Sequence, residues 1–389
     1  MSAYDVVVVG GRIAGAATAL LLARAGVRVA VVEHGRHGSD TVSTHGLMRG
    51  GVLQLSRWGV LPDVVAAETP PIREVVFHYA DGEDISVTIR PSAGVDALYA
   101  PRRYLLDRLL VDAAAAAGAE VFHQATATEL IRNADDRVIG VRVRGPRNAP
   151  RSLPGTLTIG ADGVRSTVAA AANAPVVWQG GTASGVLYRY FTGLPASGYE
   201  WAYGDGAAAG LIPTNDGTCV FVMTTPTRMR SLRSGGAEHA FATLLGVAAP
   251  ALLDRIADAQ PATGFRGWSG TPGYLRRCWG NGWALVGDAG YFKDPITTHG
   301  MTDALRDAEL LANAVLATLS GHDPAAAFTA YERTRDRLSH DMFDVTEAVA
   351  AYDWNLDKVR RLLREVSSAM SDEVEHLQAL RPPFPEPLS

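Results

Sequence analysis

The chain has 389 residues, of which 47% are hydrophobic and 20% charged, and its net charge is −5. This length predicts about two domains, and the composition is that of a soluble globular protein. The acidic balance argues against nucleic acid and anionic membranes as partners, and no uncharged run approaches the ~20 residues of a membrane span. Cys219 and Cys278 fit neither a disulfide framework nor a zinc site, which predicts free thiols in a cytoplasmic protein.

The N-terminus predicts a strand, a glycine turn, a helix and a second strand that ends in an acid. Residues 4–9 are an apolar run, residues 14–25 carry apolar side chains at helical spacing, and residues 27–32 precede Glu33. In the dinucleotide-binding fold the glycines let a pyrophosphate approach the helix N-terminus, and the acid binds ribose. The predicted dinucleotide contacts are Gly10, Arg12, Ile13, Ala14, Gly15 and Glu33.

Arg12 stands where the usual pattern G-x-G-x-x-G has its second glycine. That glycine normally lets phosphate approach the backbone, so the arginine must turn its side chain away or bind the phosphate with it. A structural strand–helix–strand unit, with glycines that serve only the turn, is the alternative interpretation.

Further elements are predicted from periodicity and turn residues. The predicted helices span 48–58, 102–117, 301–319, 324–350 and 355–370. The predicted strands span 119–122, 138–144, 157–159 and 283–286, with a hairpin at 72–89 that turns at Asp81 and Gly82. From 176 to 266 strand-like runs alternate with loops, and tyrosine and tryptophan concentrate there, which predicts an inserted antiparallel sheet. A loosely ordered, proline-rich tail is expected at the C-terminus.

Two more motifs follow the glycine turn in order: Ala161, Asp162 and Gly163, then Gly287 and Asp288 with Pro295 and Gly300 behind them. Together the three motifs resemble the single-component flavoprotein monooxygenases of the para-hydroxybenzoate hydroxylase type, over most of the chain. The resemblance implies that FAD is bound, with Asp288 on its ribityl chain and the 160–166 segment serving FAD and a nicotinamide donor. It implies further FAD contacts at Arg103, Ala127, Asp162, Gly163, Pro295, Gly300 and Met301, with Arg102 as a rival for the place of Arg103.

The chemistry expected at Gly300 agrees with the resemblance. A helix that begins at Gly300 and Met301 would direct backbone N–H groups toward the flavin ring, where reduced flavin is negatively charged. Ala169 stands where the family often has arginine, and no second glycine fingerprint exists, so NAD(P)H is expected as a transient co-substrate. The 292–300 loop also resembles flavin-dependent halogenases and geranylgeranyl-reductase-like enzymes.

The predicted fold is therefore α/β, with a Rossmann-like FAD-binding domain, an inserted mostly antiparallel β-sheet substrate domain and C-terminal helices. The FAD-binding domain is assigned to 1–70, 98–175 and 267–322. The substrate domain is assigned to 71–97 and 176–266, and a C-terminal helical region with a tail to 323–389.

The predicted function is monooxygenation through a C4a-peroxyflavin, in which NAD(P)H and O2 serve to oxygenate an aromatic or polycyclic small molecule, as in specialised metabolism. The aromatic residues of the inserted sheet favour such a pocket, although core packing explains any single one of them better. Halogenation is less favoured, because no lysine precedes Lys293. Reduction of an isolated double bond and non-catalytic flavin binding are further alternatives, and the sequence predicts no oligomeric state.

His299 is the candidate acid–base residue, because it directly precedes the flavin-facing Gly300. A loop histidine bonded to the backbone is the alternative. Lys293 and Asp294 are expected to form an ion pair that fixes the loop. The candidate substrate contacts are His45, Arg49, Arg189 and Tyr203, and no metal site is predicted.

Overall fold

The computed structural model describes residues 4–43, 45–92, 94–145 and 150–380. Its first sheet is built on the predicted N-terminal strand, β1 (Tyr4–Val9), which pairs in parallel with β2 (Val29–Glu33) and β8 (Pro150–Gly160). The strand order is β17-β18-β8-β1-β2-β5, with β7 paired to β8 and β6 paired to β7. The other strands of this sheet are β5 (Glu120–His123), β6 (Thr126–Arg132), β7 (Val138–Arg144), β17 (Trp279–Gly280) and β18 (Trp283–Leu285).

The parallel strands of this sheet end at one edge, and the helix α1 (Ile13–Arg24) follows the first of them. Val6, Val7 and Val8 are fully buried, because both faces of the strand are covered. The carboxyl ends of β1, β2, β8 and β18 lie together, so the segments that follow them meet at this edge.

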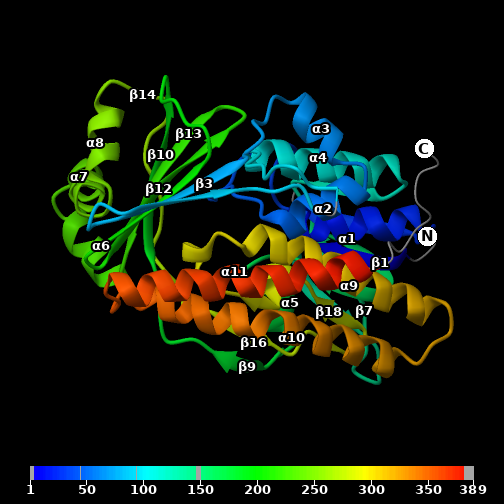
Figure 1. Ribbon diagram of the computed structural model, residues 1–389. Coiled ribbons are helices and arrows are strands. Elements are labelled where there is room, and N and C mark those ends of the chain that lie inside the picture. Colours follow the sequence, from blue (N-terminus) through cyan, green and yellow to red (C-terminus); the bar gives the residue numbers. More distant parts are fainter. Residues whose placement is uncertain (1–3, 44, 93, 146–149, 381–389) are drawn as a thin grey trace.

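The second sheet is mostly antiparallel, as predicted, and has the order β14-β10-β13-β12-β11-β3-β4 with β15 beside β10 (Figure 1). The predicted hairpin is present as β3 (Glu74–Tyr79) and β4 (Asp84–Thr88), and Gly82 supplies the positive φ of 87° in its turn. The remaining strands are β10 (Gly185–Thr192), β11 (Tyr199–Gly204), β12 (Ala207–Thr214), β13 (Gly217–Thr224), β14 (Gln260–Pro261) and β15 (Arg266–Trp268).

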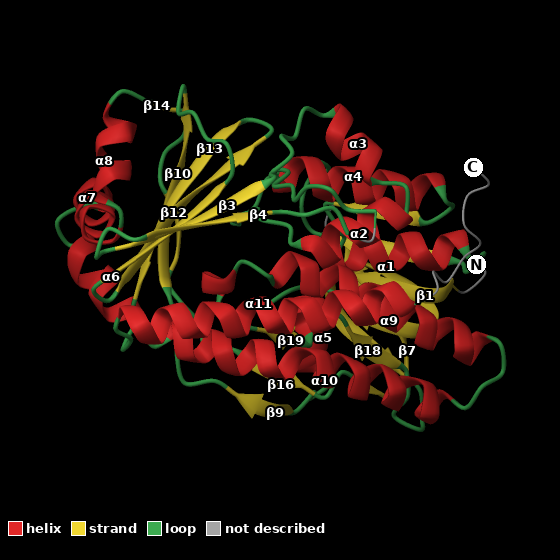
Figure 2. Cartoon of the chain, viewed as in Figure 1, coloured by secondary structure: helices red, strands yellow, loops and turns green. Residues whose placement is uncertain are grey.

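Three helices that the sequence interpretation missed cover one face of the second sheet: α6 (Pro226–Arg233), α7 (Ala237–Ala248) and α8 (Pro250–Ala257). They lie at the far left of Figure 2. Prolines at the first turns of α6 and α8 start these helices, and Phe241 and Leu244 pack against the strands. Each helix is short, so its periodicity extends over too few turns to stand out in the sequence.

Among the remaining helices, α10 (Pro324–Ala350) and α11 (Leu356–Ala379) contribute residues to the cores of both sheets. The helices α2 (Arg49–Arg57), α3 (Leu61–Ala66), α4 (Arg103–Ala116), α5 (Thr167–Ala171) and α9 (Gly300–Leu319) complete the set. The long helices α10 and α11 run side by side along both sheets (Figure 1). Tyr331 of α10 lies in the core of the first sheet and Met342 in that of the second.

Two boundaries differ from the expectations. The helix α11 continues to Ala379, beyond the predicted end at 370, and the expected loose tail at 381–389 lies outside the described residues. The strand β9 (Val176–Gln179) joins β16 (Tyr274–Arg276) and β19 (Tyr291–Phe292) in a small third sheet rather than the inserted one. The division into domains stays a prediction. Among the described residues, no helix combines the length and apolar character that a bilayer crossing requires.

Candidate functional site

A cavity of about 680 Å³ opens at the carboxyl edge of the first sheet and reaches the second sheet. Its walls come from the glycine turn, residues 41–43, 45 and 46, the 161–165 turn and the 288–304 segment. The fold thus brings together most of the predicted site. The predicted residues that line it are Gly10, Arg12, Ile13, Ala14, Glu33, His45, Arg103, Asp162, Gly163, Asp288, Pro295, His299, Gly300 and Met301.

The glycine turn is required by close backbone contacts. Gly10 has a φ of 105°, and a Cβ there would lie 2.3 Å from the carbonyl oxygen of Ala161. A Cβ on Gly15 would lie 1.8 Å from the carbonyl oxygen of Gly10. Gly15 does not line the cavity, and instead lets α1 approach the turn closely, which is the expected use of the last glycine of the fingerprint.

Arg12 turns its side chain toward helix α4. Its Nη1 donates to Asp107 Oδ2 at 2.9 Å, and Arg103 Nε donates to Asp107 Oδ1 at 3.0 Å. Asp107 thus fixes both arginines at the cavity wall. Arg102 lies outside the cavity and pairs with Asp40 at 2.6 Å, so the geometry favours Arg103 over its rival.

Two of the three predicted acids at the cavity are already bonded by the protein. Glu33 accepts hydrogen bonds from Gly11 N at 2.7 Å and Gly35 N at 2.6 Å. Asp162 accepts from Thr167 N at 2.7 Å and from the Ser166 hydroxyl at 2.5 Å, at the start of α5. These acids therefore shape the turns around the cavity, in addition to any bond to a ligand.

Asp288 differs, because no described residue donates a hydrogen bond to its carboxylate. It follows β18 and lines the cavity. Burial raises the pKa of Asp288 to about 6, although the nearby Arg103 and Lys293 lower it. A partly buried carboxylate without protein donors is a strong acceptor for ligand hydroxyl groups.

Helix α9 begins at the cavity with Gly300, and His299 at its N-cap makes no side-chain capping bond. The N–H groups of the first turn have no acceptor within the helix. Thr298 has a φ of 51°, which turns the chain sharply just before the helix. The positive end of α9 therefore points at the cavity and favours an anionic or acceptor group there.

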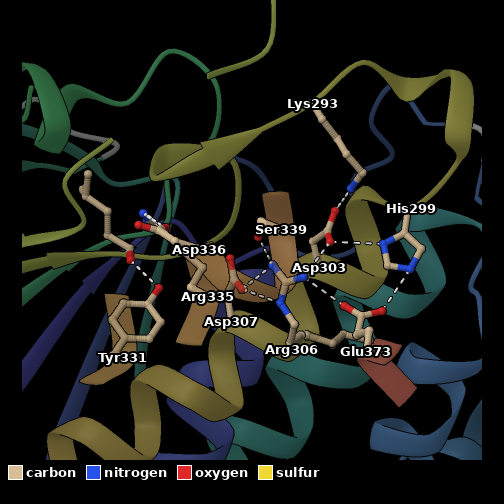
Figure 3. Close-up of polar contacts among 12 residues, drawn as sticks. Lys293, His299, Asp303, Arg306, Asp307, Tyr331, Arg335, Asp336, Ser339 and Glu373 are labelled. Atoms are coloured by element: carbon tan, nitrogen blue, oxygen red, sulfur yellow. Dashed lines mark hydrogen bonds and ion pairs between the residues drawn. The ribbon is translucent and has the colours of Figure 1, made fainter. Parts of the chain in front are cut away.

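A buried cluster of charged residues lies behind this helix start (Figure 3). Lys293 pairs with Asp303, and not with Asp294 as the sequence had suggested. Asp294 instead accepts from Ser184 N at 2.5 Å and caps the turn that follows it. The expected Lys293–Asp294 pair is therefore wrong, because helix α9 places Asp303 next to the lysine.

His299 lies between two carboxylates within this cluster. Its Nδ1 is 3.1 Å from Asp303 Oδ1, and its Nε2 is 3.0 Å from Glu373 Oε2. The alternative of a loop histidine bonded to the backbone is not what the structure has. Burial lowers the pKa of His299, and the neighbouring Glu373 opposes that effect.

The same cluster has the spacing of a metal-ligand set, since His299, Asp303 and Glu373 offer ligand atoms within 4.8 Å of one another. Arg306 donates to Asp303 at 3.1 Å and to Glu373 at 3.0 Å, and Lys293 contacts Asp303. Side-chain cations thus already neutralise these carboxylates, so the cluster is an ion-pair network.

His45 also lines the cavity, next to Gly46. It is buried, with a left-handed φ of 69°, and its Nε2 contacts the hydroxyl of Tyr190. Its Nδ1 has no partner among the described residues. Burial and the charge of Arg102 hold the pKa of His45 well below its ordinary value, so the ring is neutral at pH 7.

Comparison with known proteins decides the family. Residues 3–346 match the family described as FAD binding domain. The chain belongs to this FAD-binding family. Digeranylgeranylglycerophospholipid reductase 2 from Methanopyrus kandleri is 26% identical over 369 residues, which cover 87% of this chain and 83% of the reductase. The protein is accordingly an FAD-dependent oxidoreductase.

Two solved structures share the fold. A triple mutant of the flavin-dependent brominase Bmp2 has a TM-score of 0.82 at 18% identity, with 98% of this chain and 96% of the brominase covered. Aklavinone-11 hydroxylase, in a complex with FAD and aklavinone, has a TM-score of 0.72 at 23% identity, with 90% of this chain and 68% of the hydroxylase covered. The predicted α/β fold is thereby confirmed.

The residues at the cavity fit FAD, the cofactor of this FAD-binding family. The Gly10 turn lines the cavity before helix α1, where a diphosphate is expected, and Glu33 stands at the strand end where ribose is expected. Asp288 would accept hydrogen bonds from ribityl hydroxyls, and the N-terminus of α9 would face the electron-rich edge of the flavin. FAD itself supplies the redox chemistry.

Two predicted substrate contacts lie away from the cavity. Arg189 pairs with Glu238 at 2.9 Å on the opposite face of β10 from Tyr188, because adjacent strand residues point to opposite sides. Tyr203 is buried in the core, where its ring lies 5.9 Å from that of Trp354. Neither residue is retained as a substrate contact.

Two other predicted residues also lie outside the cavity wall. Arg49 donates to the carbonyl oxygens of Arg90 at 2.8 Å and Val95 at 3.0 Å, so it fixes a neighbouring loop. Ala127 lies in β6, paired with Val143 of β7, and does not line the cavity. Their assignment to the site stays a prediction.

The sequence interpretation missed Asp303, Arg306 and Glu373. A signal was present for Glu373: it stands in the inward seam of α11, which otherwise carries apolar residues at helical spacing. The seam consists of residues 359, 362, 366, 370, 373 and 377. A charge within such a seam indicates a buried partner.

Proposed function

We propose that the protein is a monooxygenase that uses FAD, NAD(P)H and O2 to oxygenate an aromatic or polycyclic small molecule. One observation carries this proposal: a single cavity joins the dinucleotide turn to an aromatic wall. Tyr188 and Trp268 come from the second sheet, and Tyr291 and Phe292 from the loop after Asp288. Aromatic walls favour flat, apolar ligands. A cytoplasmic location and a role in specialised metabolism stay predictions.

Within this proposal the residues of the chain have separate tasks. Asp288 and the 10–15 turn would hold the cofactor, and the aromatic wall would orient the substrate and exclude water. The neutral His45 would accept a proton from an ionisable substrate hydroxyl, or hydrogen bond to it. His299 has both ring nitrogens next to carboxylates, so an electrostatic role suits it better than that of a freely exchanging base.

The proposal is tested with FAD-loaded protein and a panel of naphthols, hydroxyanthraquinones and simple phenols. A substrate should accelerate NAD(P)H oxidation, and its product should contain one ¹⁸O atom when the reaction runs under ¹⁸O2. A product without the label, at full turnover, would contradict monooxygenation. A product that contains bromine when bromide is added would point to halogenation instead.

The second candidate is reduction of an isolated double bond, and the similarity to the Methanopyrus kandleri reductase favours it. Under anaerobic conditions a reductase should saturate a geranylgeranyl compound with dithionite-reduced FAD, whereas a monooxygenase should give no product. The two candidates are therefore separated by the requirement for oxygen.

Replacing His45 by glutamine should lower kcat for a phenolic substrate by about 10²–10⁴-fold while FAD stays bound. Because the pKa of His45 is already depressed, the ring stays neutral as the pH falls from 8 to 6, and wild-type kcat should not drop through its titration in that range. The check is kcat against pH, beside H322Q on the exposed turn after α9. Unchanged kcat in H45Q would remove His45 from the reaction.

A further inference from the structure

The cofactor-facing loop is held from behind by a residue distant in sequence. Glu373 lies on α11 near the end of the described chain, yet it is only 2% exposed. Its Oε2 is 3.0 Å from His299 Nε2, and its Oε1 is 3.0 Å from Arg306 Nη1. A carboxylate buried this deeply needs partners, and the loop and α9 supply both of them.

The four residues Asp303, His299, Glu373 and Arg306 form a closed ring of contacts (Figure 3). His299 and Asp303 line the cavity, whereas Glu373 and Arg306 lie behind them. Glu373 can therefore affect the cavity only through its neighbours. Although burial raises the pKa of Glu373, His299, Arg306 and Lys293 lower it to about 2, so its carboxylate is charged.

The missing side chain of Gly50 leaves room for Glu373 and Leu377 of α11 to pack against α2. A Cβ on Gly50 of α2 would lie 3.3 Å from Glu373 Oε2 and 3.1 Å from Leu377. Arg57, also on α2, donates to the carbonyl oxygens of Leu377 at 2.8 Å and Leu380 at 2.5 Å. The last turns of α11 are thus anchored where Glu373 meets the loop.

We propose that Glu373 is a positioning residue of the flavin cavity: its carboxylate, 3.0 Å from His299 Nε2, holds the ring beside the start of α9 and favours the protonated imidazole. The C-terminal helix is then part of the site. An imidazole between two carboxylates has one donor when neutral and two when protonated, so a charged Glu373 stabilises the protonated ring. The inference uses the cavity of the proposed function but not the identity of its reaction.

The groups that face His299 come from several elements. They are Asp303 and Arg306 of α9, Glu373 of α11 and Lys293 of the loop, and these groups in turn contact or act on Asp307, His376 and Tyr291. A change at Glu373 alone removes one negative charge from this set. Because an adjacent carboxylate favours the protonated ring, that removal should favour the neutral form of His299.

The test is histidine side-chain NMR on the full-length, FAD-loaded protein labelled with ¹⁵N-histidine, in which H299Q assigns the signals. In E373Q, which keeps the shape but not the charge, the pKa of His299 should fall by about 1–3 units, so the ring should lose its second proton at a lower pH than in wild type. The exposed Glu375 on the same helix gives the matched control, and E375Q should titrate like wild type.

The FAD dissociation constant and the thermal midpoint are measured beside the titration. A wild-type His299 titration in folded E373Q would overturn the proposal. If E373Q does not fold, E373D is used instead, because it keeps the charge but moves it away from His299 by one methylene. A shifted His299 titration in E373D supports the proposal, and an unshifted one overturns it. The test involves no substrate turnover, so its failure leaves the proposed reaction intact, and failure of the ¹⁸O2 test leaves this inference intact.

Discussion

Replacing Asp288 by alanine should give a folded protein that is purified without FAD. Its carboxylate has no donor among the described residues and faces the cavity, so its hydrogen bonds are available to the cofactor. Bonds to a charged group contribute about 1.5–3 kcal/mol each, so the loss of two should weaken FAD binding roughly 10²–10⁴-fold. The measurements are the flavin content from absorbance near 450 nm and a fluorescence titration with FAD.

The control for this variant is Asp254→Ala on the exposed face of α8 (Pro250–Ala257), which should retain FAD. Full flavin content in Asp288→Ala would contradict the assignment of Asp288 to the cofactor. It would also leave the partly buried carboxylate without a function, since no described residue donates a hydrogen bond to it.

In the cofactor-free protein, removing the charge of Asp288 should have a favourable effect, because it should raise thermal stability. The folded-state pKa of Asp288 is about 6, above its unfolded value of 3.8, so the folded chain holds this proton more tightly. Stability is therefore lost as the pH rises through about 6. Without FAD, Asp288→Asn should unfold at a higher temperature than wild type at pH 8, and the difference should shrink as the pH falls toward 4. An equal difference at both pH values would contradict the raised pKa.

The second large effect is expected from Arg306→Met, which should destabilise the protein by about 3–5 kcal/mol. Arg306 is 1% exposed and bonds to Asp303, Glu373 and Ser339, and its Nη2 lies 2.8 Å from Asp307. Methionine fills a similar volume but leaves three carboxylates buried without that cation. Thermal unfolding and soluble yield report the loss.

Two further variants show whether charge or packing causes this effect. Arg333→Met on the exposed side of α10 removes the same atoms without a buried partner, and should change the midpoint little. Adding Asp307→Asn to Arg306→Met should recover part of the stability, because one unpaired carboxylate is removed. If the double variant is no more stable than Arg306→Met, the loss comes from packing rather than from charge.

The local elements of the site were accessible to sequence reasoning because their signals are short-range. The valine run before Gly10, the apolar helix after it and Glu33 lie within thirty residues, and the resulting turn has the expected backbone contacts. Asp288 and Gly300 were placed through the motifs, and both line the cavity. The choice between Arg102 and Arg103 could not be made from the sequence, because only the docking of α4 decides which of the two side chains faces the cavity.

Arg189 and Tyr203 show where such reasoning fails. Both were chosen for residue type in a region rich in aromatics, but the face of a strand that meets a cavity depends on which layer covers it. Helix α7 covers the side of the second sheet that carries Arg189, through Glu238. Tyr203 is enclosed by α11 and its neighbours.

By itself, the sequence determined that this chain would build a parallel sheet with a dinucleotide turn, an inserted antiparallel sheet and a flavin site. Those features follow from hydrophobic period and from glycines and acids at fixed spacing. Only the tertiary structure decided which ionisable groups meet. Lys293 pairs with Asp303, and Glu373 reaches His299 across more than seventy residues. Burial makes those pairings costly to leave unmade, and helix packing, which no local pattern records, selects the partners.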